Sequence, residues 1–276
     1  MKIIVPMAGF GNRFVNAGYD QPKPLIEANG KRLIEHIVDM FDKENDEFVF
    51  ICNKKHTETT NMIGVLENLV KHCSIIVIEN HTLGPVYTVN KALDYIEDNE
   101  EVIVTYCDNP YLWDYSEFKD YVKEKDLDGC ILSHTGFHPH RLSSTYMAYM
   151  KMNRDDVVEV KEKEPYTDNH WEEPASTGTY YFKKGSYIKN YFQECVDRNI
   201  NFNGEFYVTL VYNILIEKGM DVGIYDTDFV TVFGTPEELE NFEAWANILD
   251  ALQVKSEEDL IKCYRYWRGY HENSYD

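Results

Sequence analysis

Short apolar runs alternate with amphipathic segments along the first part of the chain. In the amphipathic segments the apolar residues recur every three or four positions, as on one face of a helix. Strands are predicted at residues 3–7, 47–52, 74–78 and 102–106, and helices at 31–43, 57–72 and 84–96. This β-α-β-α-β-α-β alternation predicts a parallel sheet with helices on both faces. Ligands bind such sheets outside the carboxyl ends of the strands.

Beyond Trp113 the pattern is less regular, but strands and helices are still predicted. Helices are expected at 114–125, 185–198, 204–218 and 236–252, and strands at 129–133, 144–152, 157–163, 175–182, 220–225 and 229–233. No repeat or low-complexity linker divides the chain. The prediction is one α/β domain at 1–252, a doubly wound and mostly parallel Rossmann-like sheet, followed by a C-terminal helical tail at 253–276.

Composition narrows the expected partners and compartment. The 276 residues are 43% hydrophobic, enough for the core of one large α/β domain. A net charge of −21 argues against nucleic acid and against anionic membrane surfaces as partners. None of the six cysteines has metal-ligand spacing, and no signal peptide or membrane span is visible, so we expect reduced thiols in a cytoplasmic protein.

Residues 3–25 carry the densest chemical signal. The first strand ends in a small turn at Ala8, Gly9 and Gly11, where the missing side chains let backbone N–H groups approach a bound anion. Arg13 and Lys23 follow and add two cations on the same side. Backbone donors and paired cations beside a strand end favour a polyphosphate ligand.

A dinucleotide-binding fingerprint is the main competing interpretation of this glycine turn. That fingerprint needs a third glycine where this chain has Phe14, and a helix that starts at once. Gly18, Pro22 and Pro24 oppose a continuous helix here. The pattern therefore favours a polyphosphate over a dinucleotide.

The spacing of these residues also resembles a family signature. The pattern G-x-G-x-R from Gly9, followed by P-K-P-L from Pro22, is similar to that of the sugar-phosphate nucleotidyltransferases, or nucleoside diphosphate sugar pyrophosphorylases. With later blocks the resemblance extends to about residue 239. It implies a sheet of the nucleotide-diphospho-sugar transferase type. It also implies a nucleotide-binding turn, with Arg13 and Lys23 as catalytic residues.

Two further blocks resemble the nucleotide side of the family site. Asp108 follows the strand at 102–106, and the resemblance implies that it binds a catalytic Mg²⁺ ion. This agrees with the preference of Mg²⁺ for one or two carboxylates together with phosphate oxygens, although a capping or turn role is the alternative. Thr82 and Gly84 resemble a block that packs on the nucleobase, a role compatible with Thr82 capping the next helix.

Later blocks resemble the part of the family site that holds the acceptor. The residues implied are Glu162, Lys163, Thr177, Gly178 and Glu205. The resemblance implies that Glu162 holds a sugar hydroxyl and Lys163 the sugar phosphate, with Lys161 as a rival for the second role. A solvated charge run is the alternative interpretation of residues 160–165.

One position departs from the family pattern. Many relatives have a metal-binding Asp before a Gly-Thr pair near this point, where the matching place here is Phe233. Asp226 or Asp228 is expected to supply the second carboxylate, and we place it at Asp228. Otherwise Asp108, water and the substrates' phosphates would hold the metal alone.

The resemblance implies an enzyme that condenses a nucleoside triphosphate with a sugar 1-phosphate or similar small phosphorylated alcohol. The products would be an NDP-sugar, for surface polysaccharide synthesis, and pyrophosphate. A homo-oligomer is a further expectation, since the tail is aromatic. The alternatives are a glycosyltransferase that uses a finished nucleotide sugar and a non-catalytic nucleotide-binding relative.

Overall fold

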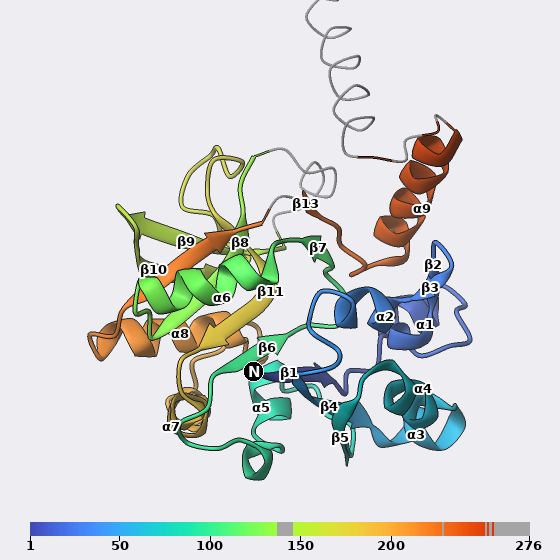
Figure 1. Cartoon of the computed structure of the whole chain (residues 1–276), viewed down its shortest axis with the longest axis horizontal. Coiled ribbons are helices and arrows are strands. Elements are labelled where there is room, and N and C mark those ends of the chain that lie inside the picture. Colours follow the sequence, from blue (N-terminus) through green and yellow to red (C-terminus); the bar gives the residue numbers. More distant parts are fainter. Residues whose placement is uncertain (137–145, 228, 252, 254–255, 257–276) are drawn as a thin grey trace, which may run out of the picture.

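A computed structural model describes residues 1–136, 146–227, 229–251, 253 and 256 (Figure 1). In this part of the chain the main sheet has nine strands, joined in the order β10-β9-β11-β6-β1-β4-β5, with β8 pairing with β11 and β12. The strands are β1 (Lys2–Met7), β4 (Glu47–Asn53), β5 (His72–Ile78), β6 (Val102–Thr105), β8 (Gly129–His134), β9 (Ala148–Asn153), β10 (Asp156–Glu162), β11 (Ala175–Phe182) and β12 (Val222–Asp226).

Short ribbons and helices complete the described part. The ribbons are β2 (Glu27–Ala28) with β3 (Lys31–Arg32), and β7 (Tyr111–Leu112) with β13 (Phe229–Val230). The helices are α1 (Asn12–Asn16), α2 (Leu33–Val38), α3 (Lys54–Thr59), α4 (Met62–Leu69), α5 (Pro85–Val89), α6 (Tyr115–Glu124), α7 (Gly185–Asp197), α8 (Val208–Glu217) and α9 (Pro236–Ala251). Helical turns of the 3₁₀ type are formed by η1 (Lys23–Leu25) and η2 (Leu93–Tyr95).

The predicted mostly parallel α/β sheet is confirmed. β1 pairs in parallel with β4 and β6, β4 with β5, and β8 with β12, whereas β11 runs antiparallel between β6 and β8. The chain passes from β1 to β4 and β5 on one side and returns to β6 on the other. The order therefore reverses at β1, and a crevice is expected at the carboxyl ends of β1 and β6.

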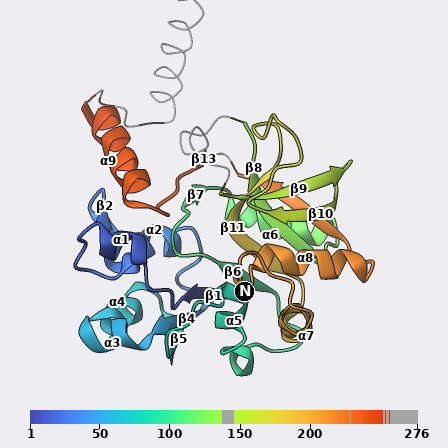
Figure 2. The ribbon, with the colours of Figure 1, turned by 180° about the vertical axis from the view of Figure 1, so that it is seen from behind.

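Strand alternation divides the core between the two faces of the sheet. Ile3 and Val5 point to the face covered by α2, α4 and α6, whereas Ile4 between them points to the face covered by α5, α7 and α8. Helix α6 lies toward the viewer in Figure 1 and α8 lies toward the viewer in Figure 2. All three residues are fully buried, so β1 is held on both faces and ends at a fixed point.

Several helices are shorter than the apolar spacing predicts. The segment expected as one helix at 57–72 is two helices, because Thr60 takes an extended conformation and its hydroxyl donates to the carbonyl of His56. The helix expected at 84–96 ends after α5 and continues only as η2. Helix α8 begins at Val208 instead of residue 204, since Phe202 and Glu205 pair across a turn.

The C-terminal predictions are tested only in part. Helix α9 confirms the helix expected from Pro236. The tail at 253–276 lies outside the described residues except for positions 253 and 256, and so does the start of the strand expected at 144–152. The single-domain boundary therefore stays a prediction. No helix in the described ranges combines the length and the apolar character needed to cross a membrane.

Candidate functional site

The glycine turn after β1 places Lys23 directly beside Asp108. Gly11 has φ +67°, a left-handed conformation, and a Cβ there would lie 3.3 Å from the Cβ of Lys23. The absence of that atom lets the lysine pass over the turn. Lys23 Nζ lies 2.6 Å from Asp108 Oδ2 and 5.4 Å from the ring centroid of Phe14. Two predicted site residues, 85 positions apart, thus form an ion pair at the carboxyl ends of β1 and β6.

A small apolar cluster anchors this turn. It comprises Phe14, Ile26, Ala28, Leu33, Phe233 and Leu239. Phe233 is fully buried there, with its ring against His36 and Phe242. Its backbone N–H donates to the carbonyl of Asp108 over 2.7 Å. The position where a family carboxylate was expected therefore faces the site with its backbone, while its side chain packs away from it.

Arg13 extends from α1 toward the same loop. Its guanidinium donates to the carbonyl of Gly234 over 3.4 Å, and the residue is exposed. The charge of Arg13 also acts on Tyr207, on the opposite side of the site. Arg13 therefore presents its charge at the mouth of the site, where a ligand can reach it.

Asp108 has the chemistry expected of a metal ligand. Its Oδ2 is paired with Lys23, whereas its Oδ1 is buried without a hydrogen-bond partner among the described residues. A buried carboxylate oxygen left in this state is costly unless a cation or a donor reaches it. The residue thus fits Mg²⁺, although no group of three or more His, Cys, Asp or Glu gathers around a metal position in the described ranges.

The structure places Asp226 but not Asp228, the two candidates for the second metal-binding carboxylate. Asp226 ends β12, and two strands, β8 and β11, separate β12 from β6. With neighbouring strands about 4.8 Å apart, β12 lies about 14 Å across the sheet from β6, the strand that Asp108 follows. The carboxylate of Asp226 instead accepts a hydrogen bond from the Ser133 hydroxyl. Asp228 lies outside the described residues, so its metal role stays a prediction.

The loop that carries Thr82 and Gly84 packs against the loop before α8. The N–H of Phe206 donates to the carbonyl of Leu83 over 2.9 Å, and a Cβ on Gly84 would lie 2.8 Å from the backbone N and O of Phe206. Thr82 is exposed at the rim. The two loops, predicted separately as base-binding and acceptor-binding, are therefore held as one unit.

His81 supports this loop from behind. The N–H of Leu83 donates to His81 Nδ1 over 3.1 Å, so the ring proton is on Nε2, which donates to Thr88 Oγ1 over 3.0 Å. Thr88 in turn donates to the carbonyl of Gly84 over 3.2 Å. Burial lowers the pKa of His81, which keeps the ring neutral in this role. The residue fixes the loop and does not face a ligand.

The acceptor-side prediction brings Glu162, Lys163 and Glu205 together. Lys163 Nζ donates to the hydroxyl of Tyr207 over 2.6 Å, and that hydroxyl donates to Glu205 Oε2 over 2.6 Å. Glu162 is 8% exposed and accepts a hydrogen bond from Thr209 Oγ1 over 2.7 Å. Burial raises the pKa of Glu162 to about 7. Tyr207 and Thr209 belong to this group, but no pattern in the sequence marks them.

A bulge in β11 places Gly178 beside the residues that follow β6. The register of β11 shifts between Ser176 and Tyr180, and Gly178 has φ +87°. A Cβ on Gly178 would lie 2.9 Å from the side-chain nitrogen of Asn109, so only glycine fits. Thr177, beside it, is buried and its hydroxyl has no hydrogen-bond partner among the described residues. Strand β11, which carries the predicted pocket residues Thr177 and Gly178, thus contacts Asn109, the residue next to Asp108.

Asn53 at the end of β4 is a further support that the sequence did not single out. Its amide donates to the carbonyl of Ala8 over 3.0 Å and to the side chain of Asn80 over 3.1 Å. Ala8 is buried and Gly9 is exposed with open space around it. The signal in the sequence that could have identified Asn53 is its place as a polar residue at the end of an apolar strand. Asn53 thereby fixes the turn from the neighbouring strand.

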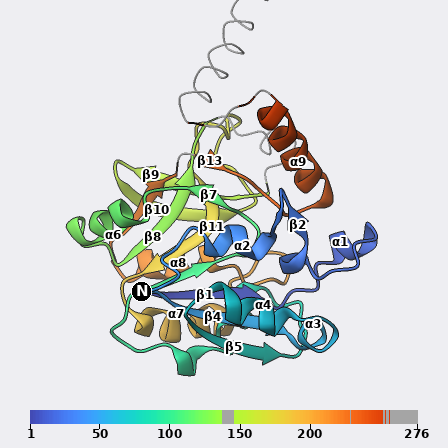
Figure 3. The same cartoon turned by 45° about the vertical axis from the view of Figure 1, so that its right-hand side comes forward.

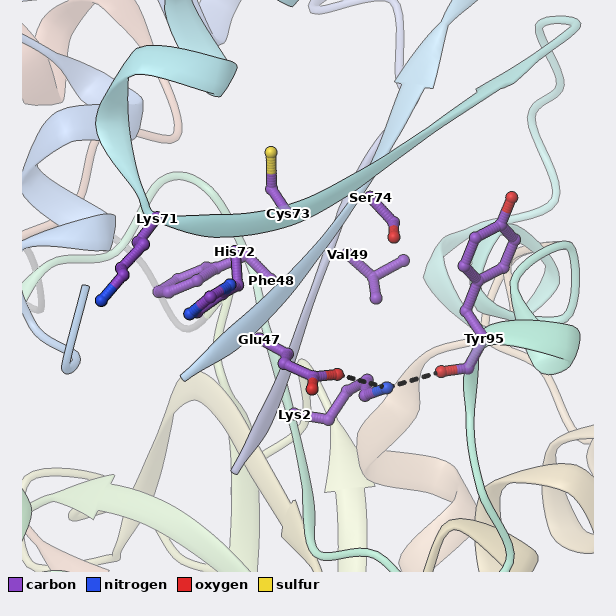
Figure 4. A pocket seen from close by; sticks show the side chains of 9 residues that line it. All are labelled: Lys2, Glu47, Phe48, Val49, Lys71, His72, Cys73, Ser74 and Tyr95. Atoms are coloured by element: carbon purple, nitrogen blue, oxygen red, sulfur yellow. Dashed lines mark hydrogen bonds and ion pairs between the residues drawn. The ribbon is translucent and has the colours of Figure 1, made fainter. Parts of the chain in front are cut away.

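A separate hollow lies at the opposite edge of the sheet (Figure 4). It is lined by the first residues of β1, β4 and β5, namely Lys2, Glu47 and His72. Lys2 is already paired with Glu47 at 2.9 Å and with Glu100 at 3.4 Å. The predicted site residues lie at the carboxyl ends of the strands, so this hollow is not part of the site.

Known proteins are similar to this chain in sequence and in fold. A family model described as nucleotidyl transferase matches residues 2–206. The chain is 24% identical over 229 residues to the bifunctional protein GlmU of Clostridioides difficile, covering 81% of this chain and 46% of that protein. It is 26% identical over 233 residues to GlmU of Thermodesulfovibrio yellowstonii, covering 82% and 47%. The chain therefore spans about half the length of these curated relatives.

Solved structures share the fold. A nucleoside-diphosphate-sugar pyrophosphorylase from Vibrio cholerae has a TM-score of 0.70 at 24% identity, covering 88% of this chain and 99% of that one. The inositol-1-phosphate CTP transferase from T. maritima has a TM-score of 0.65 at 16% identity, covering 90% and 96%. At these identities the likeness concerns the fold alone.

Proposed function

Because the chain belongs to the nucleotidyl transferase family, we propose that it condenses a nucleoside triphosphate with a sugar 1-phosphate or a similar small phosphorylated alcohol. The observation that carries the proposal is the Lys23–Asp108 pair, set under the glycine turn where the strand order reverses. Across the site stands the Lys163–Tyr207–Glu205 group, which suits a second, phosphorylated substrate.

The reaction needs little proton transfer. A phosphate oxygen of the acceptor, already ionised at neutral pH, attacks the α-phosphorus of the triphosphate, and the bond to the β-phosphate breaks with its electron pair leaving on pyrophosphate. Catalysis then rests on positioning and on neutralising charge. Lys23 neutralises the α-phosphate, where charge builds, and the exposed Arg13 holds the leaving β- and γ-phosphates.

Asp108 is proposed to hold Mg²⁺ through its unpartnered Oδ1. When bound, the ion would supply positive charge to the phosphate oxygens of both substrates. Lys23 exchanges its contact with Asp108 for the α-phosphate when substrate arrives. The ion pair with Asp108 therefore holds the amino group of Lys23 at the site.

The nucleotide and acceptor sides have separate binding groups. Ala8, Gly9, Gly11, Thr82 and Gly84 are proposed to bind the nucleotide. Lys163 anchors the acceptor phosphate, and Glu162 orients its hydroxyls, with Glu205, Thr177 and Gly178 lining the same pocket. The φ of +59° at Lys163 is unusual for a side chain of this size and supports a functional placement.

The base and the acceptor stay open. One fold neighbour is named as an inositol-1-phosphate CTP transferase and another as UDP-glucose pyrophosphorylase complexed with UDP-glucose, so the shared fold serves different bases and acceptors. We propose further that the product is an NDP-sugar for surface polysaccharide synthesis, made in the cytoplasm by a homo-oligomer. Product identification and sedimentation would test these points separately.

Pyrophosphate release tests the proposed reaction. Each triphosphate is mixed with a panel of phosphorylated sugars and alcohols in Mg²⁺, and pyrophosphate is measured. Release that requires both substrates supports the transferase. Sugar transfer from a nucleotide sugar, without pyrophosphate, would instead identify a glycosyltransferase, which needs no Arg13 and Lys23 clamp for a leaving pyrophosphate. Nucleotide binding without turnover would identify a non-catalytic relative.

A further inference from the structure

Glu238, the third residue of α9, places a buried carboxylate oxygen against Gly234, the residue after Phe233. Its Oε2 would lie 2.9 Å from a Cβ on Gly234, so the glycine leaves the space that this oxygen fills. Oε2 is buried and has no hydrogen-bond partner among the residues the structure describes. Figure 3 shows α9 beside β2.

The helix start accounts for only part of this placement. The N–H of Glu238 donates to Thr235 Oγ1 over 3.2 Å, as in a capping box. Burial raises the pKa of the Glu238 carboxyl, and the backbone N–H groups of Thr235 and Gly234 act against this. A capping box needs only one carboxylate oxygen. The oxygen Oε2 is buried and has no hydrogen-bond partner among the described residues, so it stays available to a ligand.

The chain brings this oxygen close to Asp108. Gly234 follows Phe233, whose N–H donates to the carbonyl of Asp108 over 2.7 Å. The charges of both Lys23 and Asp108 act on the Glu238 carboxyl. Two carboxylates, each with one buried and unpartnered oxygen, thus approach the same lysine. One lysine carries a single positive charge, so two ionised carboxylates in this partly buried region would leave a negative charge that a further cation can neutralise.

We propose that Glu238 supplies the second carboxylate of the Mg²⁺ site through Oε2, together with Asp108. The proposal rests on the proposed function, since it concerns the metal of that reaction. It explains how the site keeps two carboxylates although Phe233 turns its side chain away. The ligand then comes from the first turn of α9 instead of from the loop before it.

Binding of Mn²⁺ alone, followed by the EPR signal of the free ion, tests the proposal without turnover. Glu238→Gln keeps an oxygen for the cap but removes the charge. Glu237→Gln is the matched control, since this neighbour is exposed and makes the same change in net charge. Asp108→Asn marks loss of the site, and Asp228→Asn tests the rival carboxylate. Far-ultraviolet circular dichroism checks that each variant is folded. If Glu238→Gln does not fold, Glu238→Asp, which keeps the charge and a carboxylate for the cap, is used in its place.

We expect Glu238→Gln and Asp108→Asn each to weaken Mn²⁺ binding about tenfold or more, and Glu237→Gln to leave it unchanged. If Gln is not tolerated, the shorter Asp should weaken binding in a folded protein. Binding by the Glu238 variants equal to that of the wild type, or a loss confined to the Asp228 variant, would overturn the proposal. Pyrophosphate release by the wild type tests the proposed function separately from the metal assignment. If the wild type releases pyrophosphate but Glu238→Gln binds Mn²⁺ as well as the wild type does, only the assignment of Glu238 is refuted.

Discussion

Replacing Glu162 with Gln should stabilise the protein above pH 7 and change its dependence on pH. Burial raises the pKa of Glu162 to about 7 from an ordinary value of 4.5, although the Thr209 hydrogen bond and the charge of Lys163 act against this. At about 1.4 kcal/mol per pKa unit, the folded state disfavours the ionised form by roughly 3 kcal/mol. Gln keeps the size of the side chain and an oxygen for Thr209 but carries no charge.

The sign follows from proton binding. Between pH 4.5 and 7 the unfolded chain has released the Glu162 proton while the folded protein retains it. The free energy of unfolding of the wild type, relative to that of the Gln variant, is therefore highest below pH 4.5 and falls as pH rises to about 7. Above pH 7 both states are ionised and the difference is constant.

Urea unfolding of both proteins at pH 5 and pH 8 measures this effect. The free energy of unfolding of Glu162→Gln, relative to wild type, should be higher at pH 8 than at pH 5 by roughly 2–3 kcal/mol. Glu164→Gln removes a charge from an exposed position two residues away and should show no such change. A Glu162→Gln difference that is the same at both pH values would refute the assignment of Glu162 as a buried, destabilised carboxylate.

Three further substitutions probe other parts of the site. Lys23→Met should lower the rate of pyrophosphate release by about 10²–10³ because the α-phosphate loses its cation; an unaffected rate would remove Lys23 from catalysis. Gly84→Ala should lower the free energy of unfolding by about 2 kcal/mol or more, because its Cβ would meet the backbone of Phe206 at 2.8 Å and its φ is +86°; unfolding in urea at the wild-type midpoint would contradict the joined loops. Phe233→Asp should destabilise by about 3–5 kcal/mol without improving Mn²⁺ binding, since the side chain is fully buried among aromatic rings; tighter Mn²⁺ binding would show that this side chain can reach the site.

The sequence predicted strands better than helices, for physical reasons. A short apolar run such as 47–52 is stable only as a buried strand of a sheet, so the bounds of such strands were predicted to within a residue or two. Helical spacing, in contrast, continues through Thr60, where a hydroxyl–carbonyl bond ends α3. Such breaks depend on local hydrogen bonds that periodicity does not register.

The same distinction holds for the site. Lys23 and Asp108 could be placed together because both follow strands that end at one edge of a parallel sheet. The direction of the Phe233 side chain could not be predicted, since it depends on packing against Phe14 and α9. Glu238 was missed because Thr-x-x-Glu at a helix start is explained by capping alone. Only the three-dimensional structure shows that one of its carboxylate oxygens, Oε2, is buried without a hydrogen-bond partner among the described residues.

The most direct test of the central claim is triphosphate binding at the Lys23–Asp108 pair, measured without any acceptor. Chemical unfolding is followed with each of ATP, GTP, CTP, UTP and dTTP in Mg²⁺, for wild type and Asp108→Ala. One triphosphate, at about a hundred times its dissociation constant, should raise the free energy of unfolding of the wild type by about 2.7 kcal/mol. That effect should be lost in Asp108→Ala. No stabilisation by any triphosphate, or an equal effect in the variant, would contradict the account.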